Sequence, residues 1–225
     1  MELGVMIEGQ EGVTWEQWVA IADSCESHGV PVLFRSDHYW SVFEQEGRGS
    51  LDAWGTICGL AARTSKLRLG TMVSPASFRH PSVLAKLVAT ADQISGGRIE
   101  AGMGTGWHEP EHRSYGFDFK PMRERMEVLE EQVEIVTGLW AEGEFEFHGR
   151  HYGLEGVNAL PKPVQQPMPL ILGGNAGPRG AALAARFASE YNTPNPSLEE
   201  VRSRGRISPR PGRTPGVTPR RCGSR

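Results

Sequence analysis

The chain has 225 residues, of which 38% are hydrophobic and 23% charged, a composition typical of a globular protein with one sizeable core. No apolar run approaches the roughly 18 residues that a membrane-spanning helix needs, and residues 1–12 lack the basic segment of a secretory signal. The three cysteines have no CxxC or metal-ligand spacing. We therefore expect a cytoplasmic protein with reduced thiols, no membrane partner and no metal site.

Charge is distributed unevenly along the chain. Residues 202–225 contain eight Arg and no acid, so the formal net charge of −3 for the whole chain leaves −11 for residues 1–201. An acidic body argues against nucleic acid as the main partner. The basic segment has few apolar side chains, and its composition predicts disorder. We expect residues 1–201 to form the folded domain and 202–225 to lie outside the ancestral fold; a basic arm for nucleic acid or an anionic surface is the alternative.

Residues 1–201 alternate short apolar runs with amphipathic helical patterns. A capping box at Thr14, a Pro at position 81 and glycine stops mark helix ends. The alternating segment 144–154 predicts a β-hairpin. We expect strands over 3–7, 30–34, 66–73, 98–103 and 170–174, a weaker strand near 187–191, and helices over 14–28, 51–63, 81–95, 121–140 and 177–188.

Repeated β–α units whose strands are apolar on both faces predict a parallel sheet covered by helices. Two α/β architectures satisfy this pattern, a doubly wound open sheet and a (β/α)8 barrel, and both bind ligands at the carboxyl ends of their strands. The unusual residues of this chain follow strand ends: Asp37 and His38, then 74–81, 104–109 and 173–177. The sequence therefore predicts a pocket at the carboxyl edge of the sheet.

Asp37 and His38 form the first candidate pair. A histidine can take up or release a proton near neutral pH, and an adjacent carboxylate can orient it or hydrogen-bond to a ligand. The alternative is structural: Asp37 caps the next segment and His38 packs.

Glycines mark two further strand ends. Gly102, Gly104 and Gly106 form G-x-G-x-G, with Trp107 where a dinucleotide fingerprint has its third glycine. Such a run lets backbone lie close to a flat ligand or form a tight turn. The segment 173–177, GGNAG, joins a strand end to a helix start, where exposed N–H groups favour a phosphate; a simple tight turn is the alternative.

The segment 108–112, HEPEH, matches the H-E-x-x-H pattern of zinc metalloproteases. That chemistry requires both histidines on one face of a continuous helix. Pro110 interrupts the motif, and a loop signal precedes it. We therefore expect neither a helix nor a zinc site here.

Taken together, the stretches SDHYW, GTMVSPASFRHP, LVATADQISGGRIEAGMGTGWHEPEHRSYGFDF and PLILGGNAG resemble the luciferase-like oxidoreductases, and most of all the branch that uses the deazaflavin coenzyme F420. The resemblance extends from residue 1 to about 200. It implies a (β/α)8 TIM barrel with an insertion between strands four and five. It also implies a cofactor lying across the strand ends, hydride transfer at the deazaflavin C5, a small-molecule substrate and a homodimer.

The resemblance also implies roles for particular residues. Asp37 would contact the cofactor, and His38 would be the proton donor. Some members place a catalytic Glu directly after GTG; here Glu109 is the candidate, although Trp107 and His108 intervene. Met72 and Val73 match a bulge, in some relatives a non-proline cis peptide, that supports the ring. The remaining cofactor-binding candidates are Ser74, then Gly104, Thr105 and Gly106 along the ring, and Gly173, Gly174 and Asn175 at the phosphate.

The chain also departs from the family. A complete barrel needs about 250 residues, whereas the periodic sequence ends near 201, after about six βα units. We expect a C-terminally truncated barrel with weak or no activity. The first functional hypothesis is an F420-dependent oxidoreductase. The alternatives are a two-component monooxygenase that uses reduced FMN, of the alkanesulfonate or aldehyde type, and a non-catalytic flavin-binding protein.

Overall fold

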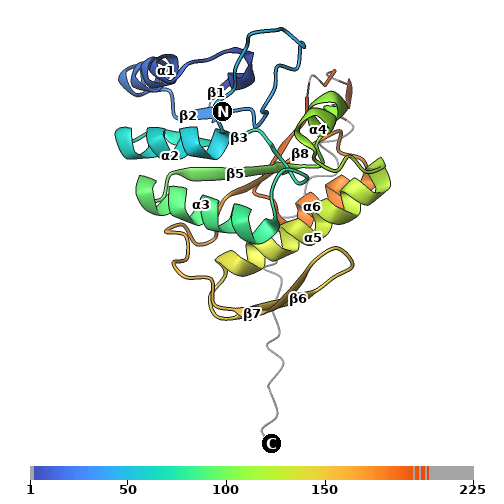
Figure 1. The fold of residues 1–225 in the computed structure, drawn as a ribbon. Coiled ribbons are helices and arrows are strands. Elements are labelled where there is room, and N and C mark those ends of the chain that lie inside the picture. Colours follow the sequence, from blue (N-terminus) through green and yellow to red (C-terminus); the bar gives the residue numbers. More distant parts are fainter. Residues whose placement is uncertain (1–2, 195, 198, 201, 203–225) are drawn as a thin grey trace, which may run out of the picture.

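Among the described residues, six of the seven strands of a parallel sheet follow one continuous order. Figure 1 labels β1, β2, β3, β5 and β8 of this sheet. The computed structural model describes residues 3–194, 196–197, 199–200 and 202, so the expected disordered segment lies outside the described residues except for Arg202. Neighbouring strands along the sheet are β1 (Val5–Ile7), β2 (Val32–Arg35), β3 (Arg68–Thr71), β5 (Ile99–Gly104), β8 (Leu170–Gly173) and β9 (Glu190–Asn192), and β4 (Ser74–Pro75) also pairs with β5.

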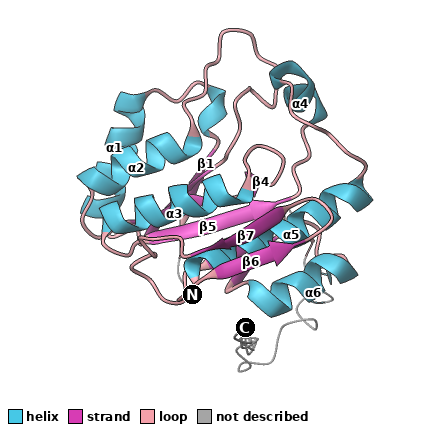
Figure 2. Ribbon diagram, turned by 60° about the horizontal axis from the view of Figure 1, so that its bottom comes forward, coloured by secondary structure: helices cyan, strands magenta, loops and turns pink. Residues whose placement is uncertain are grey.

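This strand order decides between the two architectures left open by the periodicity. In a doubly wound sheet the order reverses at a switch point, whereas here each strand pairs with the next parallel strand along the chain without reversal. The sheet curls, and the helices lie on its outer side (Figure 2). The fold is therefore part of a (β/α)8 barrel, and the prediction of an incomplete barrel of about six units is confirmed.

The helices begin and end close to the predicted positions. The capping box of Thr14 with Gln17 is present at the start of the first helix, and Gly96 ends the third in a left-handed conformation with φ of 68°. In chain order they are the 3-10 turn η1 (Gly9–Glu11), α1 (Trp15–Ser27), α2 (Ala53–Arg63), α3 (Pro81–Ser95), α4 (Glu109–Tyr115), α5 (Met122–Trp140) and α6 (Pro178–Phe187). None of the helices among the described residues is long and apolar enough to cross a membrane.

Helix α4 overturns one prediction. We expected Pro110 to prevent a helix over the HEPEH segment, but Pro110 lies in the first turn of α4. A proline there is tolerated because the first N–H groups of a helix have no partner within the helix. Only His108 falls outside α4, as its N-terminal cap residue.

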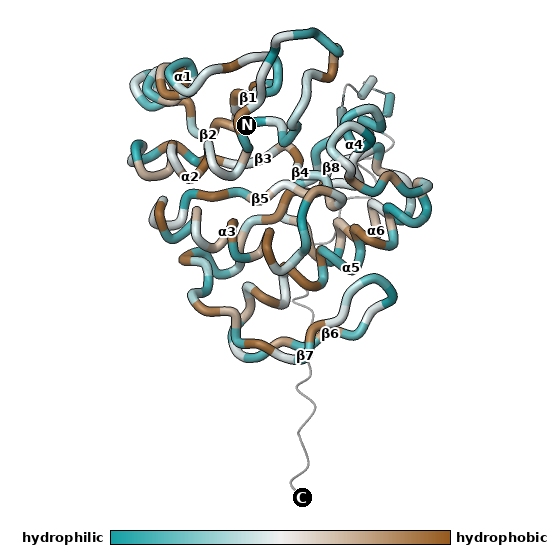
Figure 3. The backbone as a smooth tube through the Cα atoms, in the orientation of Figure 1, coloured by the Kyte–Doolittle hydropathy of each residue, from teal (hydrophilic) through white to brown (hydrophobic). Residues whose placement is uncertain are grey.

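Two groups of apolar side chains lie on opposite sides of the sheet. The larger group packs between strands and helices and includes Trp18, Trp54 and Val136. The smaller group, Val32, Phe34 and Ile171, lies beneath the half-buried Met72 and Val73. Figure 3 shows the hydrophobic stretches concentrated in the sheet and its covering helices, while the tip of the hairpin is hydrophilic.

The predicted hairpin is formed by β6 (Phe145–His148) and β7 (Gly153–Val157). Its turn is fixed by the carboxylate of Glu131 on α5, which accepts hydrogen bonds from the backbone N–H groups of Arg150, His151 and Tyr152 at 2.8–3.1 Å. The insertion between α5 and β8 is thus attached to the helix that precedes it.

The ladder between β3 and β5 is interrupted at the carboxyl edge. Leu69 and Gly70 pair with β5, and pairing resumes only at Ser74, after a cis peptide bond between Met72 and Val73. Glycine is required beside this irregularity, since a Cβ on Gly102 would lie 2.0 Å from the carbonyl oxygen of Thr71.

We expect Gly102→Ala to lower the free energy of unfolding by about 3 kcal/mol, because backbone rather than a movable side chain occupies the space. Gly153→Ala is the matched control, since a Cβ there meets no atom within 4 Å; it should change stability by less than about 1 kcal/mol. Urea denaturation followed by circular dichroism measures both. Equal stability of the two variants would contradict this description of the bulge.

Candidate active site at the carboxyl edge of the sheet

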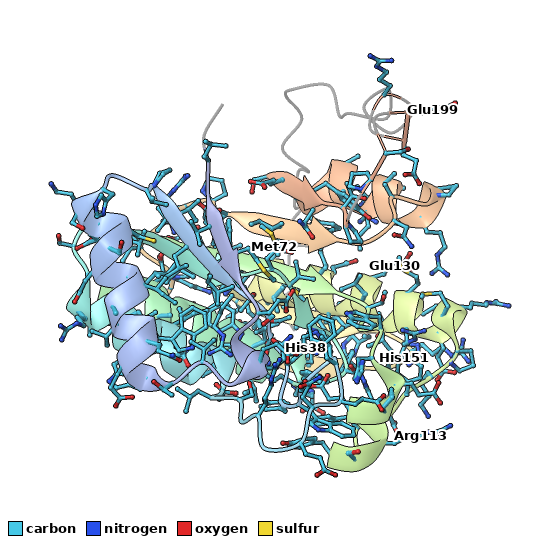
Figure 4. All side chains as sticks on the ribbon, turned by 90° about the horizontal axis from the view of Figure 1, so that it is seen from above. His38, Met72, Arg113, Glu130, His151 and Glu199 are labelled. Carbon is cyan, nitrogen blue, oxygen red and sulfur yellow. The ribbon has the colours of Figure 1, made fainter. Side chains whose placement is uncertain are left out.

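The carboxyl edge of the sheet gathers the segments singled out in the sequence. Because the strands are parallel, the residues after β2, β3, β5 and β8 all lie at this edge. Figure 4, seen from above, shows His38 and Met72 near the centre of the molecule, while Arg113 of α4 lies at the periphery. Contacts across the edge decide which of the candidates can act together.

His38 is held by an acidic residue that the sequence analysis did not single out. Its Nδ1 lies 2.7 Å from Oε2 of Glu111, which comes from the first turns of α4. Glu111 is completely buried, and its Oε1 accepts hydrogen bonds from the backbone N–H groups of Tyr39 and Trp40. His38 retains 9% exposure. A buried, hydrogen-bonded carboxylate beside a titratable ring at an open edge is an arrangement suited to proton transfer.

The carboxylate of Asp37 forms an ion pair with Arg79. Its side chain is 1% exposed; Arg79 donates to both carboxylate oxygens, at 2.5 and 3.2 Å, and the hydroxyl of Ser74 donates at 2.6 Å. Arg79 also donates to Asp52 and to the hydroxyl of Tyr39. Burial lowers the pKa of Arg79, but Asp37, Tyr39 and Asp52 together raise it above its usual value, so the guanidinium stays charged. Asp37 is thus fixed by an ion pair.

Met72 and Val73 form the predicted bulge, with the peptide bond between them cis. A Cβ on Gly104 or on Gly173 would lie 2.7 Å from Cγ2 of Val73. These glycines therefore leave room for the Val73 side chain, a reason that the sequence did not reveal. Met72 and Val73 stay half-buried above an apolar cluster, an apolar surface on which a flat ring can rest. The residues present fit a flavin-like ring.

The 173–177 turn is bound to the next strand. The N–H of Gly174 donates to the carbonyl of Asn192 at 3.0 Å, and the N–H of Ala176 donates to the hydroxyl of Tyr191 at 2.9 Å. Two of the N–H groups expected for a phosphate therefore already have acceptors. The amide of Asn192 also contacts the sulfur of Met72 at 3.2 Å, which joins this turn to the bulge.

The GTG segment leads into three residues with different environments. Thr105 and Gly106 follow β5, and Gly106 has a φ of 76°. Trp107 is 63% exposed, and its ring centroid lies 5.7 Å from that of His38. His108 is buried, and its Nε2 has no hydrogen-bond partner among the described residues.

The structure does not bring Glu109 to His38. The Glu109 carboxylate is half-exposed and pairs with Arg113 one turn further along α4, at 2.6 Å. Glu111, two residues later, faces inward instead. The acid that contacts the imidazole is therefore Glu111.

His112, the last residue of the HEPEH segment, makes two hydrogen bonds that hold its ring in place. Its Nδ1 donates to the carbonyl of His108 at 2.8 Å, and its Nε2 accepts from the hydroxyl of Ser77 at 2.6 Å. Burial lowers the pKa of His112, which favours this neutral form. Within the described part of the chain, no group of three or more His, Cys, Asp or Glu side chains is placed to hold a metal ion.

A cavity of about 370 Å³ lies beside this edge. Loop 76–80, Thr105, the first half of α5 and Tyr152 line it. It borders the site through Arg79 and Thr105, but His38 and Glu111 are not among its lining residues.

Comparison with known proteins identifies the family. A model of the luciferase-like monooxygenases matches residues 1–207. The chain is 33% identical over 144 residues to an FMNH2-dependent dimethylsulfone monooxygenase of Pseudomonas putida, covering 64% of this chain and 39% of that protein. It is 31% identical over 191 residues to the pyrimidine monooxygenase RutA of Stutzerimonas stutzeri, covering 80% and 50%. The chain belongs to the luciferase-like monooxygenase family, a family of flavin- and F420-dependent oxidoreductases.

Solved structures agree on the fold. The monooxygenase RslO1 of Streptomyces bottropensis superimposes with a TM-score of 0.79 at 26% identity, covering 92% of this chain and 64% of that one. An F420-dependent secondary alcohol dehydrogenase gives a TM-score of 0.77 at 22% identity, covering 91% and 64%. The chain thus spans about half the length or less of the first two relatives and about two thirds of these structures.

We expect Asp37→Asn to lower the free energy of unfolding by about 3 kcal/mol, because it leaves the buried Arg79 without its closest carboxylate. Asp52→Asn is the matched control. It removes the other carboxylate of Arg79, which is 46% exposed, and an Asn still caps α2, so the loss should be about 1 kcal/mol or less. Thermal or urea unfolding measures both. A larger loss for Asp52→Asn would mean that Asp37 does not anchor Arg79.

Proposed function

We propose that this protein is an oxidoreductase that transfers a hydride between reduced coenzyme F420 and a small organic substrate. One observation carries the proposal: a proton-exchanging side chain, an apolar platform and a glycine turn share one edge of the sheet. His38 with Glu111 supplies the first, Met72–Val73 the second and 173–177 the third. Membership of a family that uses flavin or F420 supports a flavin or deazaflavin as the ligand that we propose for this edge.

Each part of the edge has a proposed task. A bound deazaflavin would supply the redox chemistry; the protein's own residues bind and orient. The apolar Met72–Val73 surface would support the ring, and Gly104, Thr105 and Gly106 would lie along it. Gly173 and Asn175 would hold the phosphate, with Gly174 shaping the turn. His38 exchanges the proton that accompanies hydride transfer.

Asp37 has an indirect task in this proposal. Its ion pair with Arg79 and its hydrogen bond from Ser74 tie the end of β2 to the segment that follows the bulge. A direct contact between Asp37 and the cofactor stays a prediction. Glu109 is left out of the chemistry, since its carboxylate pairs with Arg113.

Reduced FMN with molecular oxygen is the second candidate. The names of the Pseudomonas putida relative, which is FMNH2-dependent, and of the RutA relative, a monooxygenase, favour it. The same edge would then hold an isoalloxazine ring. The third hypothesis is a non-catalytic flavin-binding protein, which would bind the ring on the same apolar surface without catalysing a reaction.

Titration of the purified chain with oxidised F420 and, separately, with FMN tests the proposal. We expect F420 to bind at least about tenfold more tightly, a difference of about 1.4 kcal/mol. Tighter binding of FMN would overturn the F420 assignment in favour of the second candidate. Binding of neither would contradict all three hypotheses.

A variant pair locates the bound ring. Val73→Asp places a charge on the platform and should abolish binding, while Val164→Asp changes an exposed valine outside the site and should not. Circular dichroism establishes that both variants are folded. Unchanged affinity in a folded Val73→Asp variant would exclude the platform as the binding surface.

A further inference from the structure

The two oxygen atoms of the buried Glu111 carboxylate have different partners. Oε1 accepts the backbone N–H groups of Tyr39 and Trp40, the residues directly after His38. Oε2 faces Nδ1 of His38 at 2.7 Å. Glu111 as a carboxylate is an acceptor on both oxygens, held on one side by the backbone of the loop whose histidine it contacts on the other.

This arrangement fixes the position of the ring hydrogen on His38. A carboxylate can only accept, so Nδ1 must carry the hydrogen, and in a neutral imidazole the other nitrogen then carries a lone pair. Within residues 3–194, no side chain or backbone group hydrogen-bonds to Nε2 of His38. The ring remains partly exposed at the edge, beside the exposed Trp107. Nε2 is therefore available to a ligand as an acceptor.

We propose that Glu111 is a positioning residue that makes His38 a proton acceptor at Nε2, directed at an O–H or N–H group of the ligand bound at this edge. The inference deepens the proposed function, on which it rests for the identity of the ligand site. It also reverses the resting role expected from the sequence, where His38 was the donor.

The proposed proton transfer involves only the ligand, His38 and Glu111. The ligand O–H or N–H bond breaks, its electron pair stays on the ligand atom, and the proton forms a new bond with Nε2. The imidazolium keeps its Nδ1–H bond to the carboxylate, which stabilises the positive charge. In the reverse direction the imidazolium returns the proton, so His38 donates only after it has been charged.

Glu111→Gln gives a sharp test because the two sides of the carboxylate differ. The Tyr39 and Trp40 N–H groups need an oxygen acceptor, so the amide oxygen takes the Oε1 position and the NH2 group faces His38. That NH2 donates to Nδ1, which must then accept, and the hydrogen of the neutral ring moves to Nε2. A substitution of nearly equal volume therefore switches the tautomer and removes the acceptor from the edge.

The measurement is the ¹⁵N NMR spectrum of histidine-labelled protein without cofactor, at a pH where the rings are neutral. The sequence has seven histidines, so His38 is assigned from the resonance lost in His38→Asn. We expect the Nδ1–H tautomer in the wild type, the Nε2–H tautomer in Glu111→Gln, and the wild-type tautomer in Glu109→Gln. Glu109 is the matched control because it lies on the same helix with its carboxylate half-exposed.

An Nε2–H tautomer of His38 in the wild type would overturn the inference, and this holds even if Glu111→Gln fails to fold. So would a folded Glu111→Gln variant that keeps the wild-type tautomer. The tautomer is read without cofactor, which separates this result from the F420 titration. Where turnover is measurable, Glu111→Gln should lower kcat about 100-fold with the KM for cofactor unchanged; a change confined to KM would contradict a role in proton transfer.

Discussion

The site depends on a close approach of three strands that only glycine permits. Where β3 passes into β4, the chain bulges at Met72–Val73. The side chain of Val73 occupies the space that a Cβ on Gly104 or Gly173 would need, and the backbone of Thr71 occupies the space beside Gly102. The neighbouring strands thus close around the bulge, and an apolar surface is left facing outward at the carboxyl edge. A larger residue at any of these glycines would push β5 or β8 away and separate the loops at the carboxyl edge.

Around this apolar surface, two buried carboxylates have opposite tasks. Asp37 is paired with Arg79, whose charge does not change in the physiological pH range, so this pair fixes geometry. Glu111 is paired with His38, and an imidazole is a group that can accept and return a proton, so in the proposed function this pair exchanges the proton. The two acids reach neighbouring positions at the end of β2 from different directions, Asp37 from the strand end itself and Glu111 from α4. In the proposed function, rigid support and proton exchange therefore belong to different residues.

Local patterns were enough to predict most elements, because helix caps, glycine stops and apolar periodicity act over short distances. The choice between a barrel and a doubly wound sheet depends on which strands pair, and apolar periodicity carries no information about pairing. The barrel was predicted from the resemblance to a family. Glu111 was missed for a related reason. It contacts a residue 73 positions away. The proline in HEPEH was taken as a helix breaker, although it lies in the first turn of α4. Once the helix start at Glu109 is known, the exposed ion pair of Glu109 with Arg113 and the buried Glu111 follow from helical spacing.

The central claim is that loops from four strands bind one ligand together. Hydrogen–deuterium exchange of the chain with and without saturating oxidised F420 tests it most directly. We expect slower exchange in residues 36–40, 72–74, 102–106 and 173–177 together. Slower exchange in only one of these segments, or only around the cavity formed by loop 76–80 and α5, would contradict it.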